Sequence, residues 1–107
     1  MLAPACDLAD AKRVQGVRYS IAYRISPARL SVGEHFSVDI AVCPATETIS
    51  ANAHMPEHRH GMNYRPDIRP QGAGRFRSEG WLFHMPGRWE FIFDVGGERL
   101  TDSLQLE

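Results

Sequence analysis

The sequence has little of what several common classes of protein require. Only one of its twelve basic side chains is a lysine, and thirteen acidic side chains bring the formal net charge to -1. Because no basic run is present to neutralise phosphates, nucleic-acid binding is not expected. No apolar stretch approaches the roughly 20 residues that a membrane-spanning helix needs. A charged and apolar leader is also lacking, so we expect either a cytoplasmic protein or an exported one without its signal peptide.

The chain also lacks the short motifs of common enzymes. It has no Gly-x-Ser-x-Gly turn, and the glycine-rich segment 72–74 precedes an expected strand rather than the helix that a phosphate-binding loop requires. Its carboxylates are spread along the chain and form no obvious acid–base pair. We therefore expect a binding module and not an enzyme.

Alternating apolar and polar side chains recur along the chain. Within 17–25 the odd-numbered positions are apolar or aromatic and the even-numbered ones are mostly polar, as in a half-buried strand. Related segments, separated by proline or glycine turn signals, lie at 36–42, 49–55, 75–85, 89–95 and 100–106. The pattern predicts one all-β domain over 17–107, an antiparallel two-sheet immunoglobulin-like sandwich of about six to seven strands. A small Greek-key barrel is the alternative.

The first sixteen residues, 1–16, are expected to be an N-terminal tail. Segment 7–15 is the one helical candidate, because Asp7 could cap it, but its weak apolar spacing also allows a coil. Cys6 and Cys43 lack the spacing of a zinc site. In an oxidising compartment they could form a disulfide that closes a loop of about 37 residues and stabilises the fold by roughly 3 to 4 kcal/mol. The alternatives are two unpaired thiols, or lipid attachment at Cys6.

Segment 54–62 carries an unusual concentration of soft and borderline metal ligands. Three imidazoles and two thioethers fall within nine residues, namely His54, Met55, His58, His60 and Met62. Imidazole nitrogen together with thioether sulfur suits copper better than other common metals. Methionine is not an ordinary ligand of zinc, calcium or magnesium. The segment therefore predicts copper as the cofactor, either Cu(I) or Cu(II).

The backbone of this segment is expected to be a loop or an irregular sheet edge. Pro56 removes a hydrogen-bond donor and Gly61 permits unusual dihedral angles. Pro56 also argues against a helix, which excludes a zinc-protease motif. If the chain is locally extended, His58 and His60 share one face and can converge on a single ion, with Met62 on the same side.

A second imidazole and thioether pair, His84 and Met85, ends the expected strand 75–85 just before a Pro-Gly turn. At a strand terminus these side chains could face the loop of segment 54–62 and complete the site. Each candidate also has a structural interpretation. A histidine can simply lie in a solvated loop or form a hydrogen bond at a strand end, and a methionine can fill a gap in the core.

Three segments of the chain resemble the YtkA-like domain family of exported bacterial proteins. They are Leu-Ser-Val-Gly-Glu-His-Phe at 30–36, Ala-His-Met-Pro-Glu-His-Arg-His-Gly-Met at 53–62 and Phe-His-Met-Pro-Gly-Arg-Trp-Glu at 83–90. The resemblance covers roughly residues 17 to 106. It implies a small immunoglobulin-like β-sandwich, related to periplasmic proteins that handle copper or mature cytochrome oxidase.

These observations lead to the hypothesis of a periplasmic or exported copper-binding or copper-delivery domain. Its first ligands would be His58, His60 and Met62, with His54, His84 and Met85 as further donors, and its partner would be a copper-accepting or other envelope protein. The rival hypothesis is a non-catalytic structural or protein-interaction module of a cell-envelope assembly that binds no metal.

Overall fold

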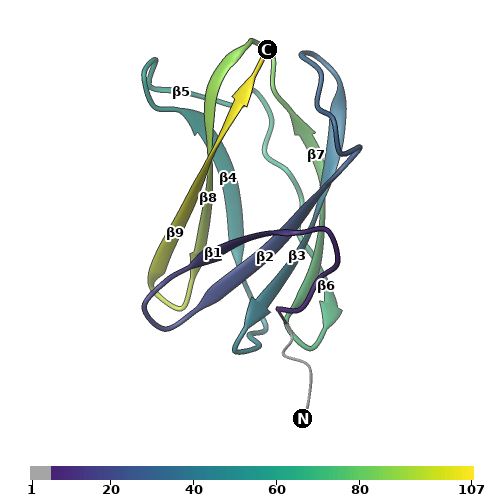
Figure 1. Ribbon diagram of the computed structural model, residues 1–107, viewed down its shortest axis with the longest axis vertical. Helices are drawn as coiled ribbons and strands as arrows, with labels where there is room; N and C mark the ends of the chain where they lie inside the picture. Colours follow the sequence, from purple (N-terminus) through teal and green to yellow (C-terminus); the bar gives the residue numbers. More distant parts are fainter. Residues whose placement is uncertain (1–5) are drawn as a thin grey trace.

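The computed structural model describes residues 6–107, and within this range the chain forms strands, turns and loops but no helix. The strands are β1 (Lys12–Gln15), β2 (Ser20–Ser26), β3 (His35–Cys43), β4 (Ser50–Met55), β5 (His60–Gly61), β6 (Arg69–Gly72), β7 (Arg75–Leu82), β8 (Gly87–Val95) and β9 (Glu98–Leu106). They form a five-stranded sheet, in the order β1-β2-β3-β7-β6, and a four-stranded sheet, in the order β5-β4-β8-β9. Figure 1 shows the two layers facing each other. The predicted all-β sandwich is confirmed.

The strand order is that of an immunoglobulin constant-type domain. Strands β2-β3-β7-β6 correspond to its A-B-E-D sheet, and β4-β8-β9 correspond to its C-F-G sheet. Every pairing between neighbouring strands is antiparallel. The described chain has nine strands rather than the expected six to seven because β1 and β5 extend the sheet edges and β6 is a short exposed strand.

Segment 7–15, the helical candidate with a coil as its alternative, is not a helix, and its end forms β1. This strand pairs with β2, and Val14 lies opposite Ile21. Pairing places the one large apolar side chain of β1 against the core while its polar neighbours stay exposed. The sheet thus begins at Lys12, within the segment expected to be a tail. Val17, expected to start a strand, is 93% exposed and precedes β2.

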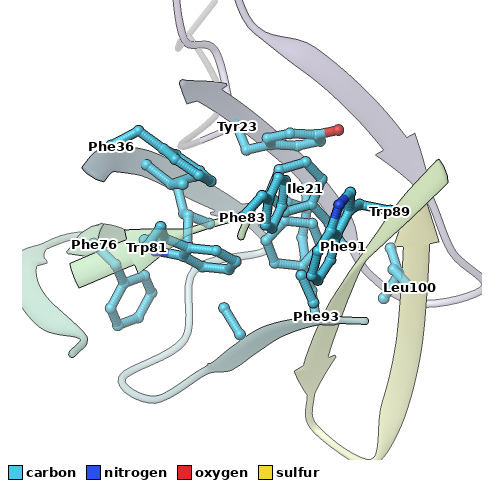
Figure 2. Close-up of a cluster of buried hydrophobic side chains, with 14 of the residues drawn as sticks. Ile21, Tyr23, Phe36, Phe76, Trp81, Phe83, Trp89, Phe91, Phe93 and Leu100 are labelled. Atoms are coloured by element: carbon cyan, nitrogen blue, oxygen red, sulfur yellow. The ribbon is translucent and has the colours of Figure 1, made fainter. Parts of the chain in front are cut away.

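The core between the sheets combines aromatic and aliphatic side chains (Figure 2). Its largest fully buried members are Trp81, Trp89, Tyr23, Phe83, Phe91 and Phe93. Phe83 and Trp89 stack with ring centroids 4.2 Å apart. Burial of each such side chain stabilises the fold by about 2 to 3 kcal/mol. This core extends to the end of the sandwich where β7 leads into β8, and it gives the connecting loop a rigid base. The described residues contain no helix long and apolar enough to span a membrane.

Candidate metal centre

A tight turn joins β4 to the two-residue strand β5. The His58 N–H donates to the carbonyl of Met55 at 3.1 Å, and Arg59 has a left-handed φ of 50°. Residues 56–59 are therefore a turn rather than an extended segment. His58 and His60 were expected to share one face only if the backbone between them were extended, which it is not. His58 lies exposed in the turn.

The register of β4 and β5 places the histidines on different faces of the four-stranded sheet. Met55 lies opposite His60, and His54 lies opposite Gly61. Residues directly opposite each other in an antiparallel pair project to the same side, and consecutive residues project to opposite sides. Because Met55 is fully buried, His60 projects toward the inner side of the sandwich, whereas His54 projects to the outer side.

His60 meets His84 at the end of the sandwich. Their Nε2 atoms are 2.8 Å apart, so that one imidazole donates to the other, and the ring centroids are 4.8 Å apart. His60 is the first residue of β5, and His84 lies in the β7–β8 connection. The structure therefore brings together one histidine from each of the two segments proposed from the sequence.

Three contacts hold the loop that carries His84. The indole N–H of Trp89 donates to the carbonyl of Met85 at 3.0 Å, and the N–H of Gly33 donates to the carbonyl of Phe83 at 2.9 Å. The ring of His84 also lies edge-on to Trp89, with centroids 5.6 Å apart. His84 is thus fixed by the aromatic core, whereas His60 is exposed on the opposing strand.

His54 takes part in a separate interaction on the outer side of the sheet. Its Nε2 lies 2.9 Å from a carboxylate oxygen of Glu90, its cross-strand neighbour on β8. The geometry does not bring His54 to the His60–His84 pair. The sequence already indicated this orientation, because His54 lies between Ala53 and Met55, and neighbouring residues of a strand face opposite sides.

The methionines differ in how far they are available. Met62 and Met85 are half-buried and pack against the core. Met55 is fully buried, and its Cε atom would lie only 2.6 Å from a Cβ atom added at Gly87. Met55 is therefore a packing residue, whereas Met62 and Met85 are partly accessible.

The one carboxylate of the turn at 56–59, that of Glu57, is paired with an arginine. Glu57 accepts a hydrogen bond from Arg88 at 2.7 Å, and this bond, together with the charge of Arg88, lowers the pKa of the Glu57 carboxyl. Across residues 6–107 no three His, Cys, Asp or Glu side chains form a group that could hold a metal ion. A metal held by His60 and His84 would therefore need thioether sulfur to complete its ligands.

The buried nitrogen of the pair is also informative. Within residues 6–107, Nδ1 of His84 is buried and has no hydrogen-bond partner. A metal-ligating histidine usually donates its second ring N–H to an acceptor, and loss of such a partner commonly lowers metal affinity by about 10- to 100-fold. The pair thus has converging nitrogens but lacks one supporting interaction of a tight site.

The two cysteines lie at the other end of the sandwich. Cys43 ends β3, and Cys6 lies in the segment that precedes β1, far from β5 (Figure 1). Both are half-buried free thiols. They are therefore separate from the His60–His84 pair.

Comparison with known proteins adds no assignment to this geometry. No family model matches the chain, and the comparisons with curated proteins and with solved structures also found no match. The resemblance to the YtkA-like family thus stays a prediction from the sequence segments that carry it.

Proposed function

We propose that the protein is a copper-binding and copper-delivery domain of the bacterial cell envelope. The observation that carries the proposal is the 2.8 Å approach of the Nε2 atoms of His60 and His84. Met62, two residues after His60, and Met85, which follows His84, would supply thioethers. The binding surface would be the end of the sandwich where β5 meets the β7–β8 connection.

The kind of donor favours copper over zinc. Structural and catalytic zinc sites use three or four nitrogen, oxygen or thiolate ligands, and the described residues contain no such group. Two imidazoles and one or two thioethers instead form a soft donor set that suits Cu(I). The proposed ligands are therefore His60, His84, Met62 and Met85, with Cu(I) as the preferred ion. His58 and His54 would lie outside this set.

The surroundings of the pair favour transfer of the ion rather than permanent storage. His60 is exposed, which leaves one side of the site open to a partner protein. Among residues 6–107, no acceptor that would strengthen a metal bond is paired with Nδ1 of His84. An exposed site of limited affinity can pass Cu(I) to an acceptor with more or softer ligands.

Anaerobic titration of Cu(I) against a chromophoric chelator tests the proposal. The titration uses protein in which both cysteines are replaced by serine, so that thiols contribute no binding. One equivalent of Cu(I) is expected, and His60→Ala or His84→Ala should lower the affinity at least about tenfold. Met62→Leu and Met85→Leu test the thioethers while keeping apolar side chains of similar size.

His54→Ala is the matched control. It removes another imidazole of the same sheet, but one that contacts Glu90 on the outer side. It should leave Cu(I) affinity unchanged. Equal losses from His54→Ala and His60→Ala would show that the pair has no special role. Absence of stoichiometric binding would favour a metal-free interaction module.

A further inference from the structure

A second feature lies on the outer face of the five-stranded sheet, where residues 6–11 cross strands β2 and β3. Leu8 is only 6% exposed, and it packs on Ala22 and Ala41, which face outward from neighbouring strands. These two alanines leave the hollow that the leucine fills. The residues before β1 therefore form a strap that covers part of the sheet.

Three arginines of the sheet bind the backbone of this strap. Arg13 donates to the carbonyl of Cys6 at 2.7 Å. Arg24 and Arg75 donate to the carbonyls of Ala9 and Asp7 at 3.1 and 2.8 Å. Arginines of β1, β2 and β7 thus fix the path of the strap across β2 and β3, and this path brings Cys6 to the end of β3.

Cys6 and Cys43 meet beside Ser20. Ser20 lies directly opposite Cys43 in the β2–β3 register, and its hydroxyl is 3.9 Å from the Sγ atom of Cys6 and 3.5 Å from the carbonyl of Cys43. The neighbouring Cys6 thiol, together with burial, raises the pKa of the Cys43 thiol. A pair of thiols in contact on a fixed backbone is the arrangement that disulfide formation requires.

We propose that Cys6 and Cys43 form a disulfide that fastens the strap to the end of β3. The oxidant is a second disulfide, either a small molecule or a thiol-oxidising protein. One cysteine thiolate attacks it to give a mixed disulfide, and the other thiolate then displaces the reduced leaving group. Both protein thiols lose their protons, and the two electrons reduce the oxidant to two thiols. A hollow of about 240 Å³ beside Cys6, Arg13 and Ser20 gives a small oxidant access.

This proposal is independent of the copper-binding function, but it affects how that function is measured. Thiolates are strong ligands for Cu(I), so the reduced Cys6–Cys43 pair could compete with His60 and His84. Once oxidised, the pair no longer offers thiolates. Oxidation of Cys6 and Cys43 to the disulfide would therefore leave His60 and His84 as the main site for Cu(I).

Equilibration of the full chain in glutathione buffers of increasing oxidised fraction, followed by acid quenching and mass analysis, tests the proposal. The expected product is a monomer about 2 Da lighter than the dithiol form, with a peptide that joins Cys6 to Cys43. Single Cys6→Ser and Cys43→Ser variants should instead accumulate a mixed disulfide with glutathione. A wild-type product with two glutathione adducts, or a disulfide between two chains, would overturn the proposal.

A second measurement uses unmodified protein and so does not depend on how the variants fold. The oxidised form should unfold at a higher urea concentration than the reduced form, because the disulfide restricts the unfolded chain. An unchanged midpoint would contradict fastening of the strap. His60→Ala should form the disulfide normally, so a failure of copper binding and a failure of the disulfide give separate results.

Discussion

Replacement of Gly74 or Gly97 by alanine tests how tightly the backbone packs around Gly74. The two glycines have nearly the same φ angle, so the variants differ mainly in what surrounds the added Cβ atom. Their φ angles are +76° and +81°, so an alanine at either position adopts a left-handed conformation. That conformation costs an L-residue about 1 to 2 kcal/mol. The loss of chain entropy in the unfolded state offsets about 0.4 to 1 kcal/mol of this cost. At Gly97 no atom lies within 4 Å of the added Cβ, and we expect a net destabilisation of about 1 kcal/mol.

The surroundings of Gly74 add a steric cost. A Cβ at this position would lie 2.7 Å from the carbonyl oxygen of Val42 and 2.9 Å from the Cα atom of Ala45. Both are backbone atoms, and the Val42 N–H also donates to the Gly74 carbonyl at 2.9 Å. Relief of the overlap would weaken this bond, at about 1 kcal/mol, and shift the chain at a further cost. We expect Gly74→Ala to destabilise the protein by about 3 kcal/mol in total.

Equilibrium unfolding in urea, followed by tryptophan fluorescence, measures the difference, since both Trp81 and Trp89 are fully buried. The midpoint of Gly74→Ala should fall by about 1 to 2 M relative to that of Gly97→Ala. Equal midpoints for the two variants would refute the steric argument. They would show that the backbone near Val42 is not packed as described.

Two further predictions concern polar contacts. Asp39 lies between Arg24 and Arg77; burial would raise its pKa, but the hydrogen bonds from the two arginines hold the pKa below its usual value. The stabilisation by the ionised Asp39 is therefore present at neutral pH and is lost as the pH falls below about 4. Asp39→Asn should lower the free energy of unfolding by about 1 kcal/mol at pH 7, and stability should then fall less steeply in acid. An unchanged dependence of stability on pH would contradict this. The hydroxyl of Tyr23 donates to Asp102 at 2.6 Å and so joins the two sheets. Tyr23→Phe should lower the free energy of unfolding, measured in urea at pH 7, by about 1.5 to 3 kcal/mol. A decrease of less than about 0.5 kcal/mol would contradict a hydrogen bond to a charged carboxylate.

Much of the fold could be predicted because one side of each major strand is buried. The alternation at 36–42, 89–95 and 100–106 marks β3, β8 and β9, whose inner side chains fill the core. Strand β6 carried no such signal, because all four of its residues are exposed. β1 was misassigned because a single apolar residue, Val14, contacts the core. Periodicity finds strands that bury a whole face, and it overlooks short edge strands.

The candidate site shows what the sequence pattern cannot determine. The residues of both segments were recognisable by type, and His84 was predicted as a possible second half of the site. The turn at 56–59, with its left-handed Arg59, depends on local backbone geometry that separates His58 from His60. The contact of His60 with His84 depends on how β5 packs against the β7–β8 connection, and the two residues are 24 positions apart in the sequence.

The proposed copper site is tested most directly by X-ray absorption at the copper edge. The sample is the oxidised protein loaded with one equivalent of Cu(I) and freed of excess metal. The account predicts two imidazole nitrogens and at least one thioether sulfur around the ion, and loss of the imidazole scattering in the His60→Ala, His84→Ala double variant. Imidazole scattering that persists in that variant, or copper that does not remain with the wild-type protein, would contradict it.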